Sequence, residues 1–374
     1  MDYVIIILIQ MTQQLTIILP TYNEVENVSV LIPLICKFLA EKDLTYSLLV
    51  VDDNSPDGTA DKVRELARSY PVELIVRTKN RSLSRAVIEG FLHSKSEVCV
   101  VMDADGSHPY ESLLDMVSPV LDNTCLISVG VRYVDDGDTT GFSFFRKVIS
   151  VFSGLLAKGL TSISDPTSGF MAVRRNALTD LTLDPIGWKI VLEVIVKLDD
   201  AELVEVPIKF KDRLHGQSKL SMKESNDYLK HLLKLYIYKY FGFFQFIKFG
   251  LVGLCGVALD LLIVFLTTQY FKFSPELSAS SGFCFAVTLN YGLHRLWTFK
   301  RSQTPYLKGL VKFIVTCLGG LSIRLLVVTT LVDYPVYGVP LHYLIVNLIG
   351  IGNAFLFNYF ISKYLVFKSK KFPN

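Results

Sequence analysis

The N-terminal part of the chain alternates short apolar runs with longer amphipathic segments. The apolar runs are bounded by turn-forming residues, which predicts buried strands, and the amphipathic segments have helical spacing. The predicted strands are 15–20, 46–53, 72–78 and 97–105, and the predicted helices are 28–42, 60–70 and 85–94. Strands that alternate with helices form a mostly parallel sheet covered on both faces, so we expect an α/β fold here.

The C-terminal part has long apolar stretches instead of short ones. Each stretch is long enough to cross a hydrocarbon core of about 30 Å as a helix. The four stretches are 243–268, 278–298, 309–332 and 342–366. We therefore expect an all-α domain of four transmembrane helices. The basic amphipathic segment before it is predicted either to lie along the lipid surface or to pack on the soluble domain as a connecting helix.

These patterns divide the chain into four expected parts. They are an N-terminal tail at 1–14, an α/β domain at 15–222, an amphipathic interface helix at 223–241 and a transmembrane domain at 242–374. The apolar run 3–9 is too short to span a bilayer and has no basic region before it. Because a second methionine follows at Met11, we expect translation to start there and residues 1–10 to be dispensable.

Composition and charge narrow the class of protein. Of the 374 residues 51% are apolar, which is high for a soluble chain and agrees with a membrane domain. The net charge of +3 is too small to indicate nucleic-acid binding. The six cysteines are scattered without C-x-x-C spacing. We expect them to be core residues in a reducing compartment rather than disulfides or metal ligands.

Acidic, basic and phenolic side chains follow the predicted strands at their carboxyl ends, where open α/β sheets bind ligands. The segments concerned are 20–24, 52–53, 77–79 and 103–105. A carboxylate pair near basic groups can hold Mg²⁺ together with phosphate oxygens. The sequence has no G-x-x-x-x-G-K-[ST] loop and no G-x-G-x-x-G after the first strand, which argues against P-loop enzymes and Rossmann dehydrogenases. The remaining interpretation is a nucleotide-diphosphate site.

An ordered series of motifs between residues 15 and 222 carries a resemblance to a known family. The motifs are LPTYNE, VVDDNSPDGT, VRTKNRSLSRAV, VMDADGSHP, GVRY, FRKVIS, SDPTSGFMAVRR and RLHGQSKL. This part resembles the inverting GT-A glycosyltransferases of family 2, and more narrowly the dolichyl-phosphate mannose synthases and their polyprenyl-phosphate relatives. The C-terminal part resembles GtrA-like membrane domains. The resemblance implies a Rossmann-like GT-A fold and a requirement for Mg²⁺ or Mn²⁺.

The resemblance also implies a donor site. Its nucleotide-binding residues would be Pro20, Tyr22, Glu24, Asp52, Lys79, Asp103, Ala104 and Asp105. Asp103 and Asp105 match the family's D-x-D motif. Asp105 is expected to bind the metal directly, and Asp103 to contact the donor substrate or to act on the metal indirectly. Ser107 stands where many relatives have a metal-ligating glutamine. We expect this hydroxyl, or water in its place, to complete the metal site.

The acceptor implied by the resemblance is a lipid phosphate. Arg132, Arg146 and Ser150 match family residues that grip this phosphate, and Arg213 matches a basic residue that closes over the diphosphate. Arginine suits phosphate because its planar fork bonds in a bidentate manner. An anionic phosphate needs no general base, only positioning and charge compensation. The expected catalytic set is Asp103, Asp105 and Arg213.

The activity implied is transfer of a hexose to dolichyl or polyprenyl phosphate with inversion. Mannose from GDP-mannose is favoured by the resemblance alone, and UDP-glucose is the alternative donor. A second alternative is a glycolipid transporter with a degenerate transferase domain. The presence of Asp52, Asp103 and Asp105 argues against degeneracy.

The membrane part has a charge bias and an internal repeat. Lys and Arg gather before the first predicted span, between the second and third, and at the C-terminus, which predicts that both termini and the catalytic domain face the cytoplasm at the cell membrane. The repeated segments are 246–256 with 310–320, and 289–300 with 357–368. This alignment puts Asp260 and Arg324 at one depth, and it predicts an intramembrane ion pair between them. The alternatives are contact of Arg324 with a lipid phosphate, and separate aqueous or polar partners for the two charges.

Overall fold

The structure is a computed structural model of the chain. It describes residues 13–132, 153–198, 203–211, 222–300, 302–331, 335–336, 339–340 and 342–368. The predictions made for the tail up to residue 12, and for Arg146, Ser150 and Arg213, lie outside these ranges. The chain divides into two compact units, which are separated between Lys239 and Tyr240.

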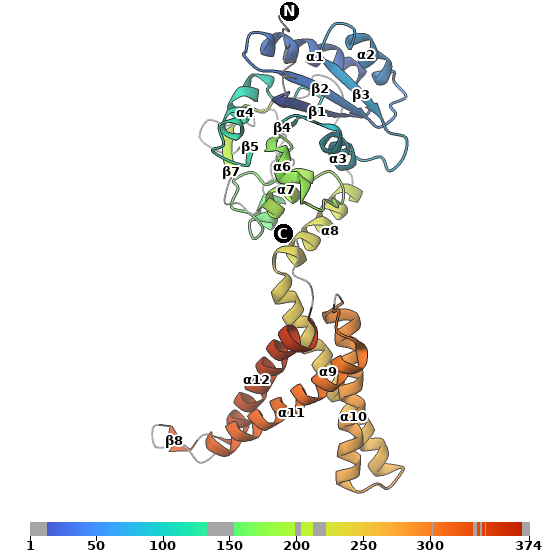
Figure 1. The fold of residues 1–374 in the computed structure, drawn as a ribbon, viewed down its shortest axis with the longest axis vertical. Helices are drawn as coiled ribbons and strands as arrows, with labels where there is room; N and C mark the ends of the chain where they lie inside the picture. The colour runs from blue at the N-terminus through green and yellow to red at the C-terminus, as the bar shows by residue number, and fades with distance from the viewer. Residues whose placement is uncertain are drawn as a thin grey trace, which may run out of the picture. The chain divides into compact units, whose positions relative to one another are not determined.

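The first unit is built on one seven-stranded sheet (Figure 1). Its strands are β1 (Leu15–Thr21), β2 (Tyr46–Asp52), β3 (Val72–Val76), β4 (Val98–Val101), β5 (Ile127–Val131), β6 (Met171–Arg174) and β7 (Leu203–Pro207). Their order across the sheet is β3-β2-β1-β4-β6-β5-β7. Strand β6 runs antiparallel to both of its neighbours, and the other pairings are parallel. The predicted mostly parallel sheet is therefore confirmed.

Helices cover both faces of this sheet (Figure 1). They are α1 (Val25–Ala40), α2 (Thr59–Leu66), α3 (Leu83–His93), α4 (Leu113–Leu121), α6 (Arg175–Thr179) and α7 (Ile190–Leu198), with a 3₁₀ turn η1 (Tyr110–Ser112). One buried apolar cluster joins the sheet to α1, α2 and α4, and a second joins it to α3 and α7. All seven residues of β1 are buried, because this strand has helices on both sides.

Helix α8 (Met222–Lys239) ends the first unit and packs on it with one face. Its buried apolar side chains are Tyr228, Leu232 and Leu235, and its exposed ones include Leu229, Leu233 and Ile237. The buried set joins a cluster formed by residues between 157 and 196. The helix is thus packed on the soluble unit, as one of the two interpretations of this segment predicts, while an apolar stripe at i, i+4 spacing stays exposed on it.

The second unit consists of two helical hairpins. Its helices are α9 (Phe241–Gln269), α10 (Pro275–Leu293), α11 (Tyr306–Leu331) and α12 (Tyr343–Ile361), with π-helical turns η3 (His294–Thr298) and η4 (Ser362–Val366) and a short strand pair, β8 (Pro335–Val336) and β9 (Val339–Pro340). Each of the four predicted stretches thus corresponds to one of these helices. Among the described helices, three are long and apolar enough to cross a membrane: Phe241–Gln269, Tyr306–Leu331 and Leu344–Val366. Helix α10 packs along α9.

The two hairpins pack on each other through equivalent contacts. The hydroxyl of Tyr291 on α10 donates to the carbonyl of the first residue of α11 at 2.8 Å. The hydroxyl of Tyr359, its counterpart on α12, donates to the carbonyl of the second residue of α9 at 3.3 Å. The rings of Phe299 and Phe367, which follow η3 and η4, stack with their centroids 4.7 Å apart. The sequence repeat therefore corresponds to a structural repeat with its aromatic core at the contact of the hairpins.

The ion pair predicted between Asp260 and Arg324 does not form. The guanidinium of Arg324 instead donates to Asn347 Oδ1 on α12, with Nη2–Oδ1 and Nε–Oδ1 distances of 2.9 and 3.1 Å. Asp260 packs against Gly282 on α10, where a Cβ would come within 2.5 Å of its Oδ1. Each charged residue thus faces the second helix of its own hairpin, which sequence alignment of the two repeats could not indicate.

Candidate functional site

The carboxyl ends of β1 and β2 meet at a buried carboxylate. Asp52, the last residue of β2, is fully buried and accepts hydrogen bonds from the hydroxyls of Thr21 (2.9 Å) and Ser55 (2.5 Å) and from the Ser55 backbone N–H (2.8 Å). These donors fix the carboxylate at the strand end. Beside it, Pro20 is buried within β1 and Tyr22 is 42% exposed.

The loop after β3 is held by an ion pair with the neighbouring strand end. Arg77 Nη1 contacts Asp53 Oδ1 at 2.5 Å, and both side chains are about nine-tenths buried. The same guanidinium donates to the carbonyl of Asn80 at 2.8 Å, and Ser82 caps α3 by accepting from the Arg85 N–H. The loop that carries the exposed Lys79 is therefore tied to the end of β2.

Two carboxylates follow β4. Asp105 is buried, and its Oδ1 accepts from both the backbone N–H (3.0 Å) and the hydroxyl (2.6 Å) of Ser107. Ser107 thus orients the carboxylate of Asp105. Asp103 is more open, with a side chain 34% exposed, and its backbone N–H donates to His108 Nδ1 at 2.9 Å. Ala104 between them is buried, and all three residues follow the carboxyl end of β4.

This pair is a candidate site for a divalent cation that is shared with a substrate. Within the described residues, no cluster of three or more His, Cys, Asp or Glu side chains gathers at one place, so a cage made of protein ligands alone is not present there. Mg²⁺ and related hard cations bind through one or two carboxylates when phosphate oxygens supply the other ligands. Asp103 and Asp105 are the candidate residues for the protein part of such a site.

His108 supports the backbone at this pair. Its ring is buried and stacks on Phe170, with centroids 5.0 Å apart. Burial lowers the pKa of the His108 imidazole, although the nearby charges of Asp103 and Asp105 act in the opposite direction. The neutral ring can accept from the Asp103 N–H through Nδ1. Through this contact His108 holds the turn after β4.

The antiparallel strand β6 brings a second loop to the same edge. Because β6 runs opposite to β4 and β5, the loop that precedes it, 164–170, lies where those strands end. Arg132, directly after β5, forms a bidentate pair with Asp165 of this loop: Nε–Oδ2 is 2.6 Å and Nη2–Oδ1 is 2.8 Å. Arg132 Nη2 also donates to Thr167 Oγ1 at 2.7 Å. The predicted phosphate-binding arginine is therefore held in place by the loop before β6.

A buried lysine completes this corner. The ammonium of Lys189, just before α7, donates to the carbonyl of Thr167 and lies 3.7 Å from the centroid of the Trp188 ring. Burial lowers the pKa of Lys189 to about 7, and the positive charge of Arg132 acts in the same direction. The carboxylates of Asp165 and Asp103 favour its charged form. The charges of Arg132, Asp165 and Asp103 therefore all act on Lys189.

Sequence reasoning did not assign Asp165, Thr167 or Lys189 to the site. Asp165 and Thr167 lie in the motif SDPTSGF, but they contact Arg132 because β6 runs antiparallel to β5. Lys189 precedes an apolar helix, and no motif or residue spacing in the sequence points to it. Gly169 was missed too: a Cβ there would lie 3.6 Å from Asp103 Oδ2, so the loop backbone approaches the carboxylate closely.

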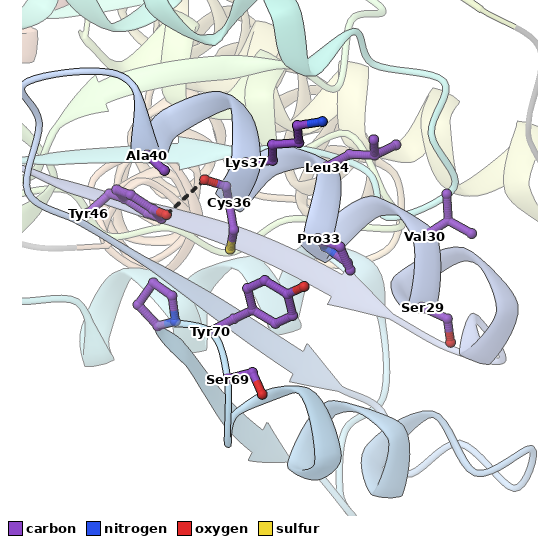
Figure 2. A pocket seen from close by; sticks show the side chains of 11 residues that line it. Ser29, Val30, Pro33, Leu34, Cys36, Lys37, Ala40, Tyr46, Ser69 and Tyr70 are labelled. Atoms are coloured by element: carbon purple, nitrogen blue, oxygen red, sulfur yellow. Dashed lines mark hydrogen bonds between the residues drawn. The ribbon is translucent and has the colours of Figure 1, made fainter.

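A separate shallow groove lies between α1, the start of β2 and the segment 69–71 that precedes β3 (Figure 2). Its volume is about 660 Å³, and it is lined by Ser29, Val30, Pro33, Leu34, Cys36, Lys37, Ala40, Tyr46, Ser69, Tyr70 and Pro71. Tyr46 begins β2, whereas Asp52 ends it. The groove has a single charged side chain among its lining residues, so it lacks the charged groups that gather at the carboxyl ends of the strands.

Both units match known protein families. The model of glycosyl transferase family 2 matches residues 16–182, and the model of the GtrA/DPMS transmembrane domain matches residues 248–367. The dolichol-phosphate mannosyltransferase of Pyrococcus furiosus is 35% identical over 358 residues, which cover 94% of this chain and 99% of that protein. The dolichol-phosphate mannosyltransferase of Saccharomyces cerevisiae is 35% identical over 244 residues, or 62% of this chain and 90% of that one.

Solved structures also resemble the first unit. A complex of glucosyl-3-phosphoglycerate synthase from Mycobacterium tuberculosis with Mn²⁺, UDP-glucose and phosphoglyceric acid has a TM-score of 0.48 and 17% sequence identity. The alignment covers 61% of this chain and 79% of that one.

Proposed function

This chain belongs to glycosyltransferase family 2 and carries a GtrA/DPMS transmembrane domain, so it is a membrane-bound glycosyltransferase, and we propose that it transfers mannose from GDP-mannose to dolichyl or polyprenyl phosphate. The observation that carries this proposal is the order of groups along one edge of the sheet. The carboxylate of Asp52 ends β2, two carboxylates follow β4, and Arg132 follows β5. The relatives named dolichol-phosphate mannosyltransferase support the choice of sugar and acceptor.

The donor nucleotide would occupy the ends of β1 and β2. Asp52 is fixed there as a buried acceptor for the base or ribose, and Tyr22 offers an exposed ring. The Arg77–Asp53 pair holds the following loop, so Lys79 is presented next to the same strand end. Asp103 and Asp105 would hold the diphosphate through Mg²⁺ or Mn²⁺, which when bound neutralises the charge that develops on the leaving group.

The acceptor would bind at the other end of this edge, around Arg132. The lipid phosphate is anionic at neutral pH, so the protein needs only to align one of its oxygens with the anomeric carbon. Attack from the face opposite the diphosphate inverts the configuration and forms no covalent enzyme intermediate. Arg132 provides charge compensation, and we assign the same role to Arg146 from its motif position. By the same reasoning Ser150 offers a hydroxyl to the acceptor phosphate, and Arg213 closes over the leaving diphosphate.

The membrane domain would keep the enzyme at its lipid substrate. The bias of Lys and Arg supports an orientation with both termini and the catalytic unit in the cytoplasm. The exposed stripe of Leu229, Leu233 and Ile237 on α8 supports contact of this helix with the lipid surface.

The decisive experiment identifies the product. Purified full-length protein is incubated with polyprenyl phosphate, Mg²⁺ or Mn²⁺, and either GDP-mannose or UDP-glucose, and the lipid fraction is analysed by mass spectrometry. We expect mannosyl phosphoryl polyprenol from GDP-mannose. A glucosylated lipid from UDP-glucose alone would replace the mannose assignment, and the absence of any glycosylated lipid with every donor would refute the transferase activity on this acceptor.

A further inference from the structure

Lys189 is a buried lysine whose ammonium forms no ion pair with the residues that the structure describes. Its side chain is 6% exposed, and its ammonium donates to one carbonyl, that of Thr167. No carboxylate in the described part of the chain lies within 4.0 Å of this ammonium. Lysine is almost never fully buried unless it is paired, because an unpaired ammonium loses its hydration. Burial of Lys189 in this state is costly to the fold, so it calls for an explanation beyond packing.

The charges around Lys189 do not supply that partner. Of the carboxylates that favour the charged form of Lys189, Asp165 has the larger effect. Both of its oxygens, however, already accept hydrogen bonds from Arg132. Arg132 itself adds a second positive charge to the corner. Asp103 also acts on Lys189, but this carboxylate belongs to the pair after β4. In the corner itself, Arg132 and Lys189 share the carboxylate of Asp165. Positive charge therefore exceeds negative charge in the described corner, as expected for an anion-binding site without its ligand.

The order of the strands places this corner relative to the donor. Across the sheet, Asp52 ends β2, the carboxylates follow β4, and Arg132 follows β5, with β6 between β4 and β5. The nucleotide end and the Arg132–Lys189 end thus flank the carboxylate pair from opposite sides. In an inverting displacement the nucleophile approaches opposite to the leaving group. An anion at this corner would stand on the nucleophile's side.

We propose that Lys189 binds the acceptor: its ammonium, together with the guanidinium of Arg132, holds the phosphate of the lipid acceptor on the side of the sugar away from the leaving diphosphate. This inference rests on the proposed function. It assigns to the acceptor site a residue that none of the sequence motifs contains. The depressed pKa of Lys189 agrees with it, since a bound phosphate anion would restore the charged form.

The chain offers a matched control for this assignment. Lys197 lies on α7, the helix that follows Lys189, and its side chain is 10% exposed, but its ammonium is paired with Glu193 at 2.5 Å. Lys189→Gln keeps a donor for the Thr167 carbonyl and removes only the charge. Lys189→Arg keeps the charge. Lys197→Gln removes a buried charge whose partner is a carboxylate of the protein.

The test uses full-length protein in lipid nanodiscs, with GDP-mannose and a short-chain polyprenyl phosphate as substrates. We expect Lys189→Gln to raise the KM for polyprenyl phosphate by roughly 10- to 100-fold, the value of a charge-assisted hydrogen bond. The dissociation constant for GDP-mannose, measured by calorimetry without lipid, should stay unchanged. Lys189→Arg should restore much of the acceptor affinity, and Lys197→Gln should leave both constants unchanged.

Thermal unfolding separates this role from a structural one. Without substrates, Lys189→Gln should be as stable as the wild type or more stable, because an unpaired buried charge is removed, whereas Lys197→Gln should be less stable because it leaves Glu193 unpaired. Addition of polyprenyl phosphate should stabilise the wild type and not Lys189→Gln.

Three results would overturn the assignment: an unchanged KM for the acceptor in Lys189→Gln, an equal loss of GDP-mannose affinity, or a collapse of its stability without substrates. Each of these leaves the wild-type reaction intact, so they are distinguishable from failure of the proposed function, in which the wild type itself makes no glycosylated lipid.

Discussion

The side chains of Arg132 and Asp165 form a buried bidentate ion pair that joins the end of β5 to the loop before β6, with Nε–Oδ2 at 2.6 Å and Nη2–Oδ1 at 2.8 Å. Asp165 is fully buried, and its pKa is lowered because the hydrogen bonds and charge of Arg132 outweigh the opposing effect of burial. The pair therefore sets where the guanidinium of Arg132 stands at the sheet edge.

Removal of Asp165 should destabilise the catalytic unit. Asp165→Ala leaves Arg132 as an unpaired buried charge, at a cost of about 3–5 kcal/mol. Asp184→Ala is the control, because Asp184 pairs with Arg85 and Lys234 at the surface, where an ion pair contributes less than about 1 kcal/mol. Thermal unfolding of the purified proteins measures both. Equal small losses in the two variants would contradict a stabilising role for the buried pair.

Asp105 should be required for transfer. Asp105→Ala removes the buried carboxylate oriented by Ser107, and we expect a loss of activity on the order of 10³-fold, as for loss of charge stabilisation at a leaving group. Asp115→Ala, an exposed carboxylate on α4, should be neutral. Mn²⁺ binding in the presence of GDP, followed by electron paramagnetic resonance, should be lost in Asp105→Ala alone. Near-normal, chelator-sensitive turnover in Asp105→Ala would refute its assignment as metal ligand.

Lys189 should make stability depend on pH in the alkaline range. Burial lowers its pKa in the folded state to about 7 from the ordinary 10.5, so between these values the unfolded chain binds more protons than the folded one. Stability conferred through this group then rises with pH, by up to about 1.4 kcal/mol per pH unit. The difference in thermal stability between wild type and Lys189→Gln, measured at pH 7 and at pH 9 without substrates, should shift in favour of the wild type at pH 9. A difference independent of pH would show that Lys189 keeps its ordinary pKa.

Arg324 should depend on Asn347 in the membrane domain. Asn347→Leu removes the amide oxygen that accepts two bonds from the guanidinium, and it should lower the melting temperature of the full-length protein. The double variant Arg324→Leu/Asn347→Leu should recover part of this loss, because the unpaired charge is gone. Asp260→Asn should show no coupling to Arg324→Leu. A strong coupling between Asp260 and Arg324 would restore the ion pair that the sequence repeat predicted.

Gly309 should be intolerant of a side chain. A Cβ at this position on α11 would collide with the phenol oxygen of Tyr291, which is fully buried and hydrogen-bonded to the Tyr306 carbonyl. Gly309→Ala should therefore cost about 1–3 kcal/mol through overpacking. Gly253→Ala on α9, where no heavy atom lies within 4 Å, should be neutral or stabilising by up to about 1 kcal/mol. Equal melting temperatures for the two variants would show that the hairpin contact is loose.

The sequence by itself determined the elements and much of the donor side. Short apolar runs ending in turn residues located β1 to β4, because strand burial and turn chemistry are written in neighbouring residues. The acids at Asp52, Asp103 and Asp105 could be placed at one sheet edge without coordinates, since parallel strands end on the same side. The long apolar stretches located the helices of the membrane domain for the same local reason.

Only the tertiary structure decided which groups meet on the acceptor side and in the membrane. The pairing of Arg132 with Asp165 depends on β6 running antiparallel between β4 and β5, and the position of Lys189 depends on how the segment before α7 packs under that loop. Arg324 contacts Asn347 because it faces the second helix of its own hairpin. These contacts join residues distant in sequence, and their geometry follows from strand direction and helix rotation, which local residue patterns do not encode.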